Sequence, residues 1–222
     1  MVLELPVNKR EKINSLCRSI RSKDLITVQE LAELVGTLVS ASPAVPYGLL
    51  YTRHLERDKT RALHVSRGRY GHRFRLSHEA IKDLLWWESR VSVVVNPIRS
   101  DHYEFQIETD ASLTGWGGSF RGRRANGFWT LQQQKFHINI LELLAIENVL
   151  RCFQSDFWNA QILIRCDNTV AIAYINNRGG CRSAVLQQIA QRIFQWAEQR
   201  EIWLVATYIP SIENVIADEE SR

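Results

Sequence analysis

The sequence predicts an α/β domain built on a mixed five-stranded sheet, preceded by a mostly helical, basic segment. In residues 101–222, period-two and helical apolar patterns follow one another in the order β-β-β-α-β-α-α-β-α. In residues 1–100 the apolar spacing is helical throughout. Charge divides the same way: the first part has 17 Lys and Arg against 10 Asp and Glu, and the second has 11 against 14. We therefore expect two parts, residues 1–100 and 101–222, joined by a short linker at 96–101.

Four helices are expected in the basic segment. The first covers residues 9–22, and the second begins at Thr27, which forms a capping-box pattern with Glu30. The second helix has to end before the two prolines at 43 and 46. A third helix is expected at 48–57, and a fourth begins at Ser77 and continues to Trp87.

A basic stretch at 53–75 separates the last two of these helices. It holds eight Arg and Lys against two acids, and Tyr70 and Phe74 lie among them. Cations that meet phosphates and rings that stack on bases are typical of nucleic-acid contact, although a solvated loop has the same composition. The candidate contacts are Arg53, Arg57, Arg67, Arg69, Arg73 and Arg75.

The second part begins with three strands expected at 103–109, 116–120 and 128–132. Turns between them favour an antiparallel meander, with a polar turn at 121–126. A helix around 140–150 and a buried strand at 161–166 follow. The remaining elements are helices at 169–176 and 183–199, a strand at 202–209 and a last helix from Asn214.

Composition excludes several classes of protein. The longest apolar runs are far too short to cross a bilayer, and the first residues lack the uninterrupted apolar run of a signal peptide. A soluble, intracellular protein without a membrane partner is therefore expected. The four cysteines have neither disulfide-framework nor zinc-finger spacing, so reduced thiols are expected.

Four acidic residues lie at the ends of the expected elements in the second part. Asp110 and Asp167 end strands, and Glu142 and Asp218 lie near the starts of helices. In a mixed sheet the first and fourth strands can be neighbours, with both helices packed across them. All four carboxylates can then meet at one edge. Each acid alone has an ordinary explanation, as a helix-capping or turn residue.

Carboxylates crowded into a small volume repel one another unless cations neutralise them. Oxygen ligands favour Mg²⁺ or Mn²⁺ over zinc. Two such ions, roughly 3.5–4 Å apart, can hold a phosphodiester between an activated water and a leaving oxygen. The four acids are therefore candidate metal ligands and candidate catalytic residues of a phosphodiesterase, with no small-molecule substrate expected.

The motifs around these acids resemble those of retroelement ribonuclease H domains. The resemblance covers the second part and rests on four motifs in order, Thr109-Asp110-Ala111-Ser112 with Gly115-Trp116-Gly117, His137-Ile138-Asn139 with Leu141-Glu142-Leu143, Cys166-Asp167-Asn168, and Asn214 to Asp218. Tyr174-Ile175-Asn176, Gly179-Gly180 and Ser221-Arg222 look most like DIRS/Ngaro-type retrotransposons. Residues 1–100 are similar to a reverse-transcriptase thumb and connection segment, mainly in helix pattern and Leu85-Trp86-Trp87.

The resemblance implies a ribonuclease H-like fold and hydrolysis of the RNA strand in an RNA–DNA hybrid with two Mg²⁺ or Mn²⁺ ions. Asp110, Glu142, Asp167 and Asp218 match the metal-ligand positions, and a reverse-transcriptase polymerase is the implied partner. Gly115 and its neighbouring glycines would let a nucleic-acid backbone approach the second strand. Ser112 and Asn168 are candidate contacts to the hybrid, although ordinary polar turn residues look the same.

The sequence departs from the family pattern in ways that leave two alternatives open. Tyr208-Ile209-Pro210-Ser211 replaces a His-Ile-Pro-Gly run, so a histidine that assists proton transfer or product release is absent, and no Tyr-x-Asp-Asp polymerase motif occurs. One alternative is a catalytically weak or inactive module that binds nucleic acid or acts as a scaffold. The other is a DNA-cutting nuclease of the same fold.

Overall fold

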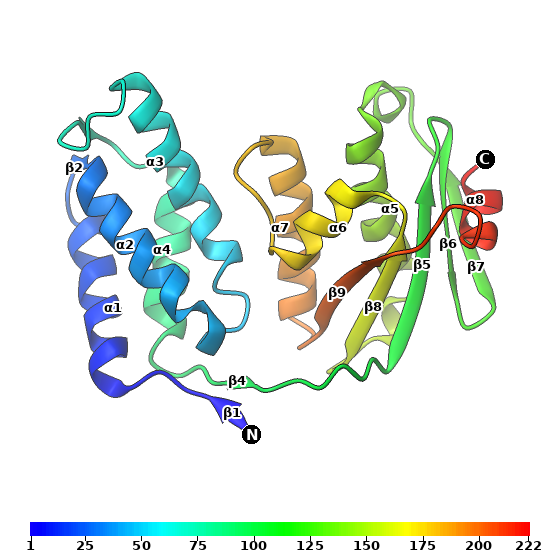
Figure 1. The fold of residues 1–222 in the computed structure, drawn as a ribbon, viewed down its shortest axis with the longest axis horizontal. Helices are drawn as coiled ribbons and strands as arrows, with labels where there is room; N and C mark the ends of the chain where they lie inside the picture. The colour runs from blue at the N-terminus through cyan, green and yellow to red at the C-terminus, as the bar shows by residue number, and fades with distance from the viewer. The chain divides into compact units, whose positions relative to one another are not determined.

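The computed structural model describes all residues, 1–222, and the chain divides into two compact units, Met1–Ser100 and Asp101–Arg222 (Figure 1). The first unit is mostly helical. The second contains the five-stranded sheet. Each unit has its own buried apolar core, so each is described separately.

The first unit packs four helices around a core that includes Leu31, Leu55 and Trp87, none of which has any exposed surface. The Thr27 hydroxyl accepts from the Glu30 amide while the Glu30 carboxylate accepts from the Thr27 amide, which confirms the predicted capping box. The elements are α1 (Val7–Arg21), α2 (Val28–Ala41), α3 (Arg53–Val65) and α4 (His78–Arg90), the 3₁₀ turns η1 (Ser42–Ala44) and η2 (Leu50–Thr52), and the paired strands β1 (Val2–Leu3) with β4 (Asn96–Pro97) and β2 (Ile26–Thr27) with β3 (Arg73–Phe74).

The third helix differs from the prediction of residues 48–57, which was wrong in both bounds. Residues 48–52 form tight turns, and Tyr51 has non-helical backbone angles (φ −86°, ψ 21°). The helix begins at Arg53 and continues to Val65 because the charged residues that follow are good helix formers. The first half of the basic stretch is therefore helical, and only its second half is a loop with a short strand.

The second unit contains a mixed sheet with the strand order β7-β6-β5-β8-β9. Strands β5, β6 and β7 are antiparallel, whereas β8 and β9 run parallel to β5, which confirms the predicted sheet and the ribonuclease H-like fold. The elements are β5 (Phe105–Ala111), β6 (Gly115–Phe120), β7 (Arg123–Phe128), η3 (Gln133–Lys135), α5 (Ile138–Cys152), η4 (Gln154–Asp156), β8 (Gln161–Cys166), α6 (Thr169–Asn176), α7 (Ala184–Glu198), β9 (Trp203–Tyr208) and α8 (Val215–Ser221).

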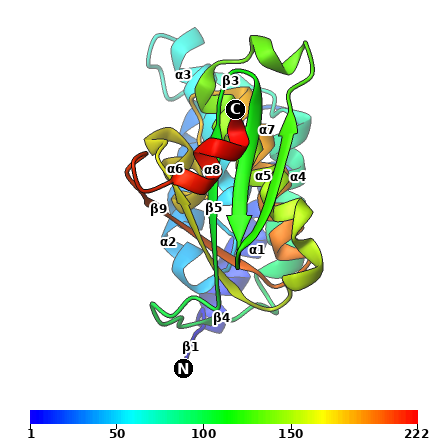
Figure 2. The ribbon, with the colours of Figure 1, turned by 90° about the vertical axis from the view of Figure 1, so that its right-hand side faces the viewer.

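Helices cover both faces of this sheet. α5, α6 and α7 lie on one face, and α8 crosses the other in front of β5, β6 and β7 (Figures 1 and 2). Adjacent glycines of β6 show how closely the helices pack. A Cβ on Gly118 would lie 2.3 Å from a methyl of Val149 in α5, and one on Gly117 would lie 2.4 Å from the carbonyl oxygen of Ala217 in α8. Helices thus cover both faces of the sheet where β5 pairs with β6, at the position of Asp110 and Gly117.

The third strand also corrects the sequence analysis, which placed it at 128–132. β7 instead occupies Arg123–Phe128 and pairs along its whole length with β6. The turn before it has only two residues, Arg121 (φ 50°) and Gly122 (φ 76°), both in the left-handed region that a tight hairpin of this kind requires. β7 is an edge strand whose polar residues do not have to alternate with buried ones, so period-two analysis missed it.

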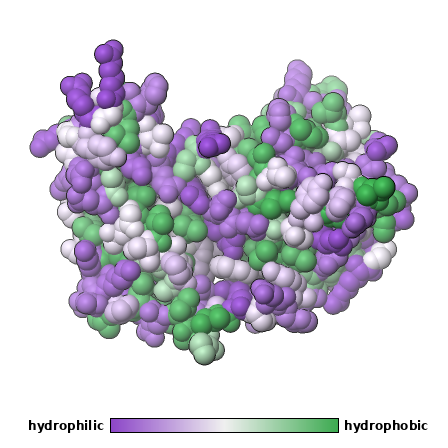
Figure 3. All heavy atoms as spheres, viewed as in Figure 1, coloured by the Kyte–Doolittle hydropathy of each residue, from purple (hydrophilic) through white to green (hydrophobic).

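The molecule has no helix long and apolar enough to cross a membrane. On the face shown in Figure 3, hydrophilic and hydrophobic residues are interspersed in both units. Hydrophilic side chains also project from the end of the first unit where α3 ends and the basic loop begins (Figure 3).

Candidate active site

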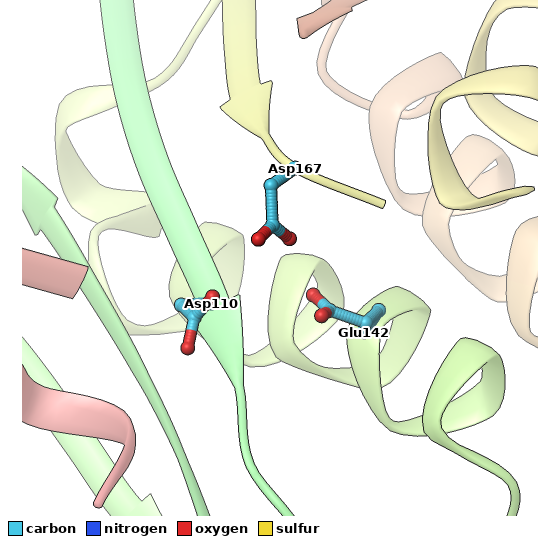
Figure 4. Close-up of side chains that lie close together, drawn as sticks. All are labelled: Asp110, Glu142 and Asp167. Atoms are coloured by element: carbon cyan, nitrogen blue, oxygen red, sulfur yellow. The ribbon is translucent and has the colours of Figure 1, made fainter. Parts of the chain in front are cut away.

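Three of the four predicted acids meet at one edge of the sheet. Each of Asp110, Glu142 and Asp167 offers an oxygen, and these oxygens all lie within 4.8 Å of one another. Figure 4 shows their carboxylates directed toward a common space. Asp110 and Glu142 are buried, and Asp167 is partly exposed.

The strand register explains why these acids meet. β5 and β8 are parallel and pair from Phe105↔Ile162 to Glu108↔Arg165. Asp110 and Asp167 each lie two residues beyond that last pair, so they reach the same edge together. Glu142 comes from α5, which begins at this edge and packs against β5.

The His137 side chain begins α5. Its Nδ1 accepts from the Asn139 amide at 3.2 Å, which places this ring at the helix N-terminus. The polar start of the helix therefore fixes where its first turns lie, and Glu142 follows one turn into α5.

The environment of Glu142 strongly favours its protonated form when no cation is present. Burial first, and then the negative charges of Asp110 and Asp167, raise the pKa of Glu142 to about 9. Its Oε2 atom is buried and has no hydrogen-bond partner. A buried carboxylate oxygen without a partner, facing two other carboxylates, is the environment that a divalent cation satisfies.

Asp110 has a raised pKa for related reasons. Burial is the largest cause, and the charges of Asp167 and Asp218 add to it. Two groups act in the opposite direction: a hydrogen bond from Ser221 and the charge of Arg222. The Ser221 Oγ donates to Asp110 Oδ2 at 2.7 Å.

Asp167 also accepts a hydroxyl hydrogen bond, from Ser211. Ser211 lies in the loop after β9, at the position where the related motif has glycine. Tyr208, which replaces the motif's histidine, is 55% exposed at the end of β9 and pairs in register with Cys166. Two of the three clustered acids are thus oriented by serines, and sequence patterns gave no signal for either contact.

Asp218, the fourth predicted acid, is not part of the group within 4.8 Å. It lies on α8, and its side chain is 36% exposed and forms an ion pair with Arg222 at 2.8 Å. It is near enough to Asp110 for its charge to raise the pKa of that residue. The structure therefore places Asp218 beside the cluster rather than within it.

The three small residues predicted to contact nucleic acid all have structural partners within the chain. The Ser112 hydroxyl accepts from the Gly115 amide at 3.0 Å and donates to the Ser221 carbonyl. A Cβ on Gly115 would lie 3.0 Å from that same carbonyl, so the space above it is taken by α8. Asn168 caps α6 and donates to Asn139 at 3.0 Å. The Cβ side of Gly115 is therefore covered by α8, and contact of these three residues with nucleic acid stays a prediction.

The six candidate arginines belong to the first unit. Arg57, Arg67, Arg69 and Arg73 are exposed, whereas Arg53 is partly buried and pairs with Glu56 at 2.9 Å. Arg75 is exposed and pairs with Asp24 at 2.8 Å. Four of the six are thus exposed and form no ion pair with a carboxylate, and they lie along α3 and the loop that follows it.

The donor set fits a hard divalent cation. All ligands are carboxylate oxygens, one buried oxygen lacks a partner, and no histidine or cysteine joins the group. Such ligands suit Mg²⁺ or Mn²⁺. Asp110, Glu142 and Asp167 are the residues that would hold the ion.

Comparison with known sequences finds one informative relative. No protein-family model matches the chain. An enzymatic polyprotein of Carnation etched ring virus is 30% identical over 127 residues, covering 50% of this chain and 18% of the polyprotein. The chain thus spans less than a fifth of the curated relative that it matches.

Comparison with solved structures finds ribonucleases H and reverse transcriptases. LC11-RNase H1 in complex with an RNA/DNA hybrid is 17% identical, with a TM-score of 0.46, over 53% of this chain and 93% of that protein. RNase H1 from Halobacterium salinarum is 16% identical (TM-score 0.43) over 52% and 92%. The foamy viral protease-reverse transcriptase in complex with an RNA/DNA hybrid is 14% identical (TM-score 0.34) over 91% and 27%.

Proposed function

We propose that this chain is a metal-dependent endonuclease that hydrolyses the RNA strand of RNA–DNA hybrids, as part of a retrotransposon reverse transcriptase. The observation that carries the proposal is the meeting of Asp110, Glu142 and Asp167 around a common space, with one buried oxygen lacking a partner. The motif resemblance and the match to a viral polyprotein support the reverse-transcriptase context, and the DIRS/Ngaro type rests on the motifs alone.

Each residue of the site has a defined part in this reaction. Bound divalent cations would supply Lewis-acid chemistry, activating a water and stabilising the leaving oxygen. Asp110, Glu142 and Asp167 would hold the cations, and Ser211 and Ser221 keep two of these carboxylates oriented. Water adds to phosphorus as the bond to the leaving sugar oxygen breaks; the water loses a proton to solvent and the leaving oxygen takes one up, which gives a phosphate monoester and a free sugar hydroxyl.

The exposed arginines of α3 and the following loop are the proposed contacts to the hybrid's phosphates. They are Arg57, Arg67, Arg69 and Arg73. Because phosphate contacts release counterions, binding through these residues weakens as salt rises. The polymerase part of a reverse transcriptase is the proposed partner chain or neighbouring domain.

A cleavage assay tests the proposal. The full chain is incubated with a hybrid labelled on its RNA strand, with Mg²⁺, with Mn²⁺ or with a chelator. Cleavage is expected with either metal and not with the chelator, and Asp110→Asn is expected to abolish it. Asp101→Asn, which changes an exposed acid outside the cluster, is the matched control and is expected to cleave like the wild type.

The same assay separates the two alternatives. Binding of the hybrid without a metal-dependent product would favour the scaffold module. Cleavage of DNA junctions without cleavage of hybrids would favour a DNA-cutting nuclease. Either result would overturn the proposed activity.

A further inference from the structure

The seven-residue helix α8 is anchored to the sheet at both ends. Before its first residue, the buried Asn214 donates its Nδ2 to the Thr109 carbonyl of β5 at 3.0 Å. In its last turn, Glu220 accepts from Asn126 of β7. Ser221, the last helical residue, is 1% exposed and faces β5. These anchors matter because a helix of seven residues is not stable by itself.

Ser221 makes a different kind of contact from the other anchors. Its hydroxyl proton has two acceptors in reach, Asp110 Oδ2 at 2.7 Å and the Asp218 carbonyl at 3.0 Å. The shorter contact is to a carboxylate, and hydrogen bonds to charged acceptors are the stronger ones. The Asp110 contact therefore dominates.

The backbone of Ser221 is fixed as well. Its carbonyl accepts from the Ser112 hydroxyl, which in turn accepts from the amides of the β5–β6 turn. Both Ser112 and Asp110 belong to one short stretch of chain at the end of β5. This stretch thus binds the backbone carbonyl of Ser221, and the Ser221 hydroxyl in turn binds the Asp110 carboxylate.

We propose that Ser221 is a positioning residue of the metal site: its buried hydroxyl orients the Asp110 carboxylate and ties the helix that carries Asp218 to it. The proposal rests on the proposed function, because it assumes that Asp110 is a metal ligand. Ser221 donates to Oδ2 of Asp110, and Oδ1 takes no part in this contact. Outer partners that orient a ligand in this way change metal affinity when removed.

The proposal is tested by Mn²⁺ binding to the full chain, measured by calorimetric titration without substrate. Ser221→Ala is expected to weaken Mn²⁺ binding by about tenfold. The matched control is Asn126→Ala, which removes one hydrogen bond between the same turn of α8 and β7, keeps the pairs of Arg124 with Glu219 and Glu220, and leaves the Asp110 contact intact. It is expected to lower the thermal midpoint of unfolding as much as Ser221→Ala does, with Mn²⁺ affinity within about twofold of the wild type.

Three outcomes decide the matter. Wild-type Mn²⁺ affinity in Ser221→Ala, or equal losses in Ser221→Ala and Asn126→Ala, would overturn the role of Ser221 and leave the nuclease proposal standing. If Asp110→Asn binds Mn²⁺ as tightly as the wild type does, the metal site itself is overturned. If Ser221→Ala lacks the circular dichroism of the wild type, Ser221→Cys replaces it, because a thiol keeps the volume but is a weak donor.

Discussion

The helices α5 and α8 each bring an acidic residue to the same edge of the sheet, but they are held there in different ways. α5 has 15 residues, and eight of them are buried, Glu142 among them. α8 has seven residues, and only Ala217 and Ser221 are buried. Core packing therefore places Glu142, whereas a few hydrogen bonds and ion pairs place Asp218.

The candidate site therefore has a rigid part and an anchored part. The rigid part consists of two strand ends and a helix inside the core, where a displaced carboxylate would disturb close packing. The anchored part depends on a few hydrogen bonds and ion pairs, of which the contacts of Asn214 with Thr109 and of Ser221 with Asp110 are buried.

Glu142→Gln should have the largest effect on catalysis. The substitution keeps the shape of a buried side chain but removes a charge from the centre of the cluster, so kcat for hybrid cleavage is expected to fall by at least about 1000-fold. Glu147→Gln is the control, because Glu147 lies in the same helix and pairs with Arg192. Activity within tenfold of the wild type in Glu142→Gln would contradict a central role for the rigid part.

Asp218→Asn should have a smaller effect. Asp218 lies outside the group of three acids and is partly exposed, so we expect a loss of about 10- to 100-fold in kcat/KM. Glu219→Gln, which changes the next acid along α8, should leave the rate close to that of the wild type. If Asp218→Asn were as damaging as Glu142→Gln, the distinction between the two helices would not hold for catalysis.

The double variant with Arg57→Gln and Arg73→Gln tests whether residues outside α5 and α8 bind the phosphates of the substrate. Loss of two phosphate contacts should weaken hybrid binding by about tenfold and reduce the slope of log K against log salt by about 1.4 to 1.8. Lys12→Gln with Arg18→Gln removes the same charge from α1 and serves as the control. An unchanged salt slope in the first variant would remove these arginines from the interface.

The stability of the metal-free chain should depend on pH through Glu142. Its pKa is near 4.5 in the unfolded chain and about 9 in the folded one, so the folded state binds a proton more tightly. The stabilisation is complete below the lower value and is lost as pH rises toward 9. We expect the thermal midpoint to fall by about 10 °C between pH 6 and pH 9, with a clearly smaller fall in Glu142→Gln. Equal slopes in both proteins would show that Glu142 does not titrate in this range.

The elements with clear apolar periodicity could be predicted from the sequence. β8 and α6 were placed at their observed bounds, and the capping residues Thr27 and Ser77 were identified correctly. β7 was misplaced because none of its residues is buried, and α3 because two of its four buried positions are polar, His54 and Asp58, so that apolar spacing does not show the helical period. Tertiary pairing, rather than local pattern, determines such elements.

The acids of the candidate site could be selected from the sequence, because strand order brings Asp110 and Asp167 to one edge. The positions of their partners could not. Ser221 follows Asp110 by 111 residues, and Ser211 follows Asp167 by 44, so no local spacing marks either pair. The sequence also could not show which element covers Gly115, because that depends on the packing of α8 against β6.

The arginines of β7 have a consequence for how the sheet ends. β7 is the last strand on its side, so one row of its backbone amides and carbonyls has no strand neighbour. Arg123 and Arg124 lie along it and pair with acids of the same unit, Asp156, Glu219 and Glu220. Cationic side chains on an open edge hinder the addition of a foreign strand, so the residues that concealed β7 from pattern analysis also protect the folded chain against edge-to-edge aggregation.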